Sequence, residues 1–99
     1  MEKINNLKEQ ANNQFKHNDY QKAINMYEEA LTAVNFRLDD IQKDHPNYDD
    51  KEERLLQISL LSNLALCYFK LDQYPESQLY NGKLLALDPD HPKGRYRAI

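Results

Sequence analysis

Five side chains that can donate hydrogen bonds stand at regular spacings in this chain of 99 residues. Lys8 and Asn12 are four residues apart, as are Lys93 and Arg97, and Asn63 lies between the two pairs. Residues four apart are neighbours on one face of a helix. Lysine supplies an ammonium group, arginine a fork of donors and asparagine a neutral donor, so the set suits recognition of an anion. A single lysine on a helix is most often a solvated surface residue, and Asn12 alone carries little weight because the chain has ten asparagines.

Other kinds of chemistry are poorly represented. The three histidines, His17, His45 and His91, share no ligand spacing that would indicate a metal site. Cys67 lies in an apolar segment, where a buried structural thiol is expected. The chain has no glycine-rich phosphate loop and no pair of carboxylates that spacing singles out for acid–base work. We therefore expect no catalytic site, no metal, no cofactor and no enzyme activity.

Composition indicates one globular domain or part of one, with 40% hydrophobic and 29% charged residues. The net charge of −3 is concentrated in 36–54, which holds seven acids and four bases. A nucleic-acid binder would carry a basic stripe, so nucleic acid is an unexpected partner. No apolar run is long enough to span a membrane. A single cysteine fits a reducing compartment, and we expect the cytoplasm, with the nucleus as an alternative.

Helical spacing of apolar residues dominates the chain, and no segment alternates like a strand. The fold class predicted is therefore all-α. Asn18 and Asp19 can cap a helix that starts at Tyr20, and Pro46 marks the loop after it. Gly82 weakens the middle of its helix by roughly 1 kcal/mol relative to alanine. The predicted helices run from Ile4 to near His17, from Tyr20 to the Pro46 loop, from Asp50 to near Leu71, from Tyr74 to about Leu87, and from Pro92 to Ile99.

Two similar hexapeptides occur in the chain, FKHNDY at 15–20 and FKLDQY at 69–74. Each copy falls where one predicted helix ends and the next begins, so each is the hinge of a helix–turn–helix unit. The pattern resembles the tetratricopeptide repeat (TPR), a helical hairpin of about 34 residues. The residues that match it are Ala11, Tyr20, Ala23, Tyr27 and Ala30 in the first unit, and Ala65, Tyr68, Tyr74, Ser77, Asp88 and Pro89 in the second.

The resemblance implies antiparallel hairpins stacked as an α–α superhelix, about two and a half repeats in a single domain or fragment. Repeat one would cover 4–37, with a helix extension and loop to about 57, because the two hexapeptides are farther apart than one repeat length. Repeat two would cover 58–91, and 92–99 would start repeat three. Asn81 and Leu84 stand where an aromatic residue and an alanine are usual, so the fourth helix is expected to pack less closely.

In stacked hairpins of this kind, the first helix of each unit lines a concave groove. Asn63 precedes Arg97 by one repeat length, so the two would occupy equivalent places in successive units. Lys8, Asn12, Asn63, Lys93 and Arg97 then resemble the dicarboxylate clamp of co-chaperone repeats, notably those of the large immunophilins. That resemblance implies binding of the C-terminal Glu-Glu-Val-Asp tail of heat-shock protein 90 or heat-shock protein 70. A terminal aspartate presents two carboxylates to such donors.

Two phenylalanines are candidates for the same groove. Phe15 either offers apolar surface to the valine of such a peptide or only packs between helices. Phe69 is open to the same two interpretations.

Several alternatives remain open from the sequence. The chain could be an unrelated helical bundle with a chance hexapeptide. It could be a repeat scaffold that binds a different protein through the acidic extension 36–54. It could also be the docking segment of a larger peptidyl-prolyl isomerase whose catalytic domain lies elsewhere. The predicted fifth helix is too short to persist without packing, so we expect further residues after Ile99 to stabilise it.

Overall fold

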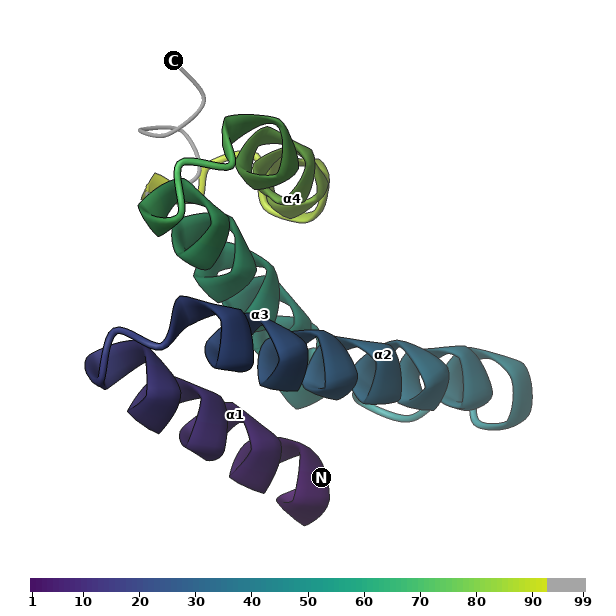
Figure 1. The fold of residues 1–99 in the computed structure, drawn as a ribbon. Coiled ribbons are helices and arrows are strands. Elements are labelled where there is room, and N and C mark those ends of the chain that lie inside the picture. The colour runs from purple at the N-terminus through teal and green to yellow at the C-terminus, as the bar shows by residue number, and fades with distance from the viewer. Residues whose placement is uncertain (93–99) are drawn as a thin grey trace.

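The computed structural model describes residues 1–92 and contains four α-helices in that range, with no strand. Each helix packs against the next one in the chain (Figure 1). This arrangement confirms the all-α class and the stacked helical-repeat architecture. The predicted helix from Pro92 to Ile99 lies outside the described residues, apart from Pro92 itself. The helices are α1 (Glu2–Lys16), α2 (Tyr20–Asp44), α3 (Lys51–Lys70) and α4 (Tyr74–Leu87).

The second and third helices are longer than the first. In Figure 1, α1 lies along the first half of α2, and the second half of α2 runs past the N-terminus of α1. Leu38 and Ile41 from this half, and Leu56 from α3, are buried. The extra residues between the two hexapeptides therefore form longer packed helices, with a short loop around Pro46.

The two hexapeptides form the same turn. Asn18 and Asp72, at the fourth position of each copy, have φ angles of 62° and 58°. Asparagine and aspartate tolerate this left-handed region better than most residues. The Tyr20 hydroxyl donates to Asn18 Oδ1 at 3.0 Å, and the Tyr74 hydroxyl donates to Asp72 Oδ1 at 2.9 Å. The repeated sequence thus encodes a repeated hinge.

Aromatic pairs hold each hinge closed. Phe15 and Tyr20 meet edge to face with ring centroids 5.2 Å apart, and Phe69 and Tyr74 do so at 5.4 Å. Such edge-to-face contacts add roughly 0.5–1.5 kcal/mol to the burial of the rings. In the first hinge, Asp19 also caps α2 by accepting a hydrogen bond from the Lys22 amide at 3.2 Å.

Small residues let the helices approach closely at the repeat positions. Ala11, Ala23, Ala30 and Ala65 are completely buried, and larger apolar side chains fill the core around them. Asn81 and Leu84 are also buried, at 3% and 0% exposure. Both side chains of α4 are therefore part of the packed interior at the positions where the repeat usually has an aromatic residue and an alanine.

A shared carboxylate joins three helices. Glu28 on α2 accepts hydrogen bonds from the hydroxyls of Tyr68 on α3 and Tyr80 on α4, each at 2.9 Å. The two rings stack with centroids 5.5 Å apart, and the Lys83 ammonium lies 5.2 Å from the centre of the Tyr80 ring. Burial, followed by the bond to Glu28, raises the pKa of Tyr80 to about 12 and raises that of Tyr68 as well. Both hydroxyls are therefore neutral donors at physiological pH.

A partly buried ion pair joins the extended parts of α2 and α3. Arg37 Nε lies 2.9 Å from Glu53 Oε2, and the Glu53 side chain is only 1% exposed. Burial alone would raise the pKa of Glu53, but hydrogen bonds from Arg37, its own backbone amide and Tyr48 outweigh it, and the pKa is lowered. Glu53 is therefore a buried anion whose charge depends on Arg37.

Candidate functional site

Three residues of the predicted site, Asn12, Phe15 and Asn63, line one surface depression. Asn12 on α1 and Asn63 on α3 line a hollow of about 220 Å³, although they lie far apart in the sequence. Tyr27 from α2 lies in the lining between these two helices, because α2 packs against both. The full lining consists of Asn12, Phe15, Lys16, Tyr27, Asn63 and Leu66.

A hydrogen bond from the core fixes the orientation of the Asn12 amide. The Tyr27 hydroxyl donates to Asn12 Oδ1, and Tyr27 is 2% exposed. Burial, with a smaller contribution from Cys67, raises the pKa of Tyr27 to about 12, so its hydroxyl stays a donor at neutral pH. Because the amide oxygen is occupied, the NH₂ group is left as the donor that Asn12 can offer to a ligand.

Asn63 is available from α3. Within residues 1–92 its side chain makes no hydrogen bond, and it is only partly exposed. It also borders a second hollow of about 360 Å³ on the same face of α3, next to Leu55, Ile58 and Ser59. Asn63 therefore stands between two depressions and offers an amide to both.

Lysines extend the site along α1. Lys8 lies one helical turn before Asn12, is partly buried, and makes no ion pair with another described residue, but it does not line the hollow. Lys16 does line the hollow and was missed by the sequence prediction. Its signal was available, since Lys8, Asn12 and Lys16 repeat at intervals of four along one helix face.

Two residues of the predicted set, Lys93 and Arg97, lie outside the described residues.

The two phenylalanines differ in position. Phe15 packs against Tyr20 in the hinge and also lines the hollow beside Asn12. Phe69 packs against Tyr74 and is 47% exposed, but it lines none of the hollows described for this part of the chain.

Two of the remaining candidate groups, Cys67 and His17, are engaged in structure. Residues 1–92 contain no cluster of three His, Cys, Asp or Glu side chains that could hold a metal ion. Cys67 is fully buried, and burial raises the pKa of its thiol to about 12. His17 Nδ1 lies 2.7 Å from the carbonyl oxygen of Asn13 at the end of α1. None of the helices in the described residues combines the length and apolar character needed to cross a bilayer.

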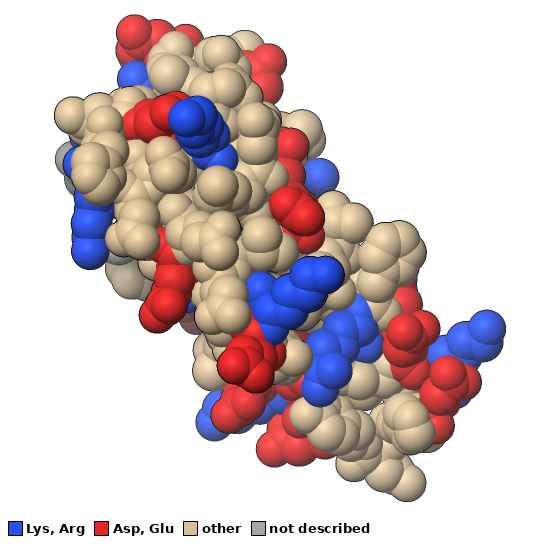
Figure 2. All heavy atoms as spheres, turned by 60° about the horizontal axis from the view of Figure 1, so that its bottom comes forward, with Lys and Arg blue, Asp and Glu red and all other residues tan. Residues whose placement is uncertain are grey.

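Charge is mixed over the described surface seen in Figure 2. Lysine and arginine side chains alternate there with aspartate and glutamate, without a continuous basic stripe. By contrast, the hollow between α1 and α3 has Lys16 in its lining and no acid. The local field in the hollow therefore favours an anionic ligand over a cationic one.

Comparison with known proteins supports the repeat architecture. No family model matches the sequence. The structure is similar to the C-terminal TPR-containing domain of a Plasmodium falciparum protein described as an FK506-binding protein, with a TM-score of 0.77 and 30% sequence identity. The match covers 96% of this chain and 60% of that one, so the chain spans less than two thirds of its neighbour. The chain thus has a TPR-like helical-repeat fold, built from one repeated hinge and closely packed consecutive helices.

Proposed function

We propose that the chain is a protein-interaction module that binds an acidic C-terminal peptide of the Glu-Glu-Val-Asp type, as carried by heat-shock protein 90 or heat-shock protein 70. The terminal aspartate of such a peptide presents its side-chain carboxylate and the carboxylate of the chain end. Asn12 and Asn63 would donate to these groups, and Lys8, Lys93 and Arg97 would neutralise them.

One observation carries the proposal: amides from two sequence-distant helices, Asn12 on α1 and Asn63 on α3, line the same hollow. The bond from Tyr27 leaves the Asn12 amide oriented as a donor. Phe15 adds apolar surface next to these donors, which suits a valine that precedes the terminal aspartate. The similarity to a TPR-containing domain supports a peptide-binding role for this face.

The energetics favour a modest affinity. Each hydrogen bond to a charged group contributes about 1.5–3 kcal/mol net. Ordering a flexible peptide and losing its translational freedom offset much of this gain. A handful of such bonds therefore gives a micromolar Kd, which corresponds to a binding free energy of about −8 kcal/mol.

A labelled Glu-Glu-Val-Asp peptide tests the proposal by fluorescence polarisation. It should bind with around micromolar affinity, and binding should weaken as salt is raised, because the contacts are between exposed charges. The same peptide with an amidated C-terminus should lose most of its affinity, since one of its two terminal carboxylates is gone. Equal binding of the amidated peptide would contradict the two-carboxylate mechanism.

Matched variants localise the binding. Lys8→Ala and Asn63→Ala should each weaken binding, the lysine change by at least about 1.5 kcal/mol. The controls are Lys43→Ala and Asn6→Ala, which remove exposed side chains of the same types away from the hollow. If the site variants bind as well as these controls, the peptide sits elsewhere on the chain.

A second candidate function is favoured by the description of the structural neighbour as an FK506-binding protein. The chain would then be the docking segment of a larger peptidyl-prolyl isomerase. In that case residues 1–99 alone should show no prolyl isomerase activity, while the peptide binding described above is retained. Isomerase activity of residues 1–99 alone would contradict a pure docking role.

A further inference from the structure

A second groove lies on α2, away from the hollow between α1 and α3. It follows the second half of α2, which runs past the N-terminus of α1 and which α1 therefore leaves uncovered (Figure 1). Its volume is about 610 Å³, within the usual range of ligand pockets. The lining residues are Ala33, Phe36, Arg37, Asp40, Ile41, His45 and Tyr48.

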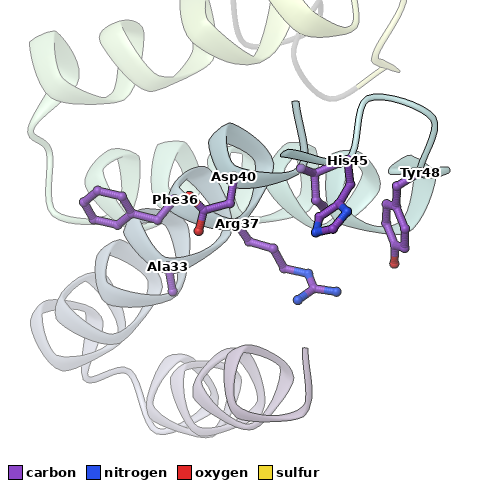
Figure 3. Close-up of a pocket in the computed structure, with 7 residues that line it drawn as sticks. Ala33, Phe36, Arg37, Asp40, His45 and Tyr48 are labelled. Carbon is purple, nitrogen blue, oxygen red and sulfur yellow. The ribbon is translucent and has the colours of Figure 1, made fainter. Parts of the chain in front are cut away.

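The groove combines a buried aliphatic side chain with two exposed aromatic rings. Ile41 in its lining is buried, whereas Phe36 and Tyr48 stand on either side of Arg37 in Figure 3, with 67% and 49% of their surfaces exposed. A phenylalanine this exposed gains little from folding, so its surface is available for burial against another molecule. Exposed aromatic residues are also the side chains that most often dominate binding energy at protein interfaces.

The charge around the groove is negative. Arg37, the one lysine or arginine in its described lining, is held by the buried carboxylate of Glu53 at 2.9 Å, so its charge is compensated. Asp40 at the rim makes no ion pair within residues 1–92. The surrounding segment 36–54 carries three more acids than bases. A partner that fits this field must carry lysine or arginine beside its apolar side chains.

We propose that this groove docks a basic amphipathic helix of a partner protein, with its apolar face against Phe36, Ile41 and Tyr48 and its cations towards Asp40. A helix is the occupant that the geometry favours, because the uncovered part of α2 continues the surface on which α1 itself packs. Recognition would follow the helix-in-groove mode, with apolar anchors three and four residues apart. The groove lies outside the proposed carboxylate site, so both ligands can bind together.

A designed peptide provides the probe. A labelled helical peptide of about 14 residues, leucine on one face and lysine on the other, spans about 21 Å. It should bind the chain with salt-dependent affinity, and the Glu-Glu-Val-Asp peptide should not displace it. Replacing every lysine by glutamate should abolish binding. If the glutamate peptide binds equally well, or if the acidic tail peptide competes, the proposed recognition is wrong.

Variants of the chain then locate the contact. Phe36→Ala should weaken binding about tenfold, as expected for an aromatic anchor, and Asp40→Asn about threefold, as expected for a rim charge. The control is Leu79→Ala on α4, whose side chain is 57% exposed and distant from the groove lining. Equal affinities of Phe36→Ala and Leu79→Ala would overturn the proposal. Concentration-dependent dimerisation abolished by Phe36→Ala would also overturn it, since the occupant would then be a second copy of the chain.

Discussion

The carboxylate of Glu28 should contribute strongly to stability, because two hydroxyls from other helices depend on it. Glu28→Ala removes the shared acceptor of Tyr68 and Tyr80, both of which donate at 2.9 Å. Hydrogen bonds to a charged group contribute about 1.5–3 kcal/mol each, and partial exposure places these two at the low end. We expect a loss of about 2–3 kcal/mol in the free energy of unfolding.

Urea unfolding followed by circular dichroism measures this loss. With a slope of about 1–1.5 kcal/mol per molar urea, the midpoint should fall by about 2 M. Glu29→Ala is the matched control, since Glu29 is an exposed acid next in the chain and the same helix propensity change applies to it. Glu28→Gln keeps a neutral acceptor and should lose less than Glu28→Ala. A surface substitution typically changes the free energy of unfolding by about 0.5 kcal/mol or less. If Glu28→Ala costs no more than that, the hydrogen bonds from Tyr68 and Tyr80 to Glu28 do not stabilise the fold as argued.

Three further outcomes follow from the described contacts. Gly82→Ala should raise the free energy of unfolding by about 0.5–1 kcal/mol, because an added Cβ meets nothing within 4 Å, and Ala86→Gly should lower it by a similar amount. Arg37→Ala should lower the free energy of unfolding by about 2–3 kcal/mol, because Glu53 would stay buried without its cation. Since the pKa of Glu53 is lowered from 4.5 in the folded protein, this difference between the variant and the original chain should be complete above pH 4.5 and shrink below it. The pKa of Tyr80 rises from 10.0 to about 12 on folding, so its contribution to the free energy of unfolding should be constant below pH 10 and fall between pH 10 and 12. In urea titrations, Tyr80→Phe should make this fall in stability with pH shallower.

Features that depend on local sequence were predictable. The start of α2 after Asp19, the loop at Pro46 and the end of α3 near Leu71 follow from caps, prolines and apolar periodicity within a few residues. The hinge geometry was predictable for the same reason, since the contacts of Asn18 with Phe15 and Tyr20 lie within one hexapeptide.

Features that depend on which faces meet were not predictable. The bond from Tyr27 to Asn12 requires the relative rotation of α1 and α2, which periodicity leaves undetermined. In the sequence, Arg37 and Glu53 are two of the many charges in 36–54, and nothing marks them as partners. The antiparallel packing of α2 on α3 brings them together as an ion pair. That Asn12 and Asn63 line the same hollow could be predicted only from the repeat pattern, which places the first helices of successive hairpins along one groove.

The hydroxyl of Tyr80 reaches its acceptor on Glu28 across 52 residues of chain, whereas most packing in the described fold joins one helix to the next. Contacts between neighbouring helices close short loops and form early, and proteins dominated by them fold fast. The Tyr80–Glu28 contact cannot form until two successive hairpins are already docked. During refolding, its appearance should therefore mark the last step of assembly, when independent hairpins become one cooperative unit.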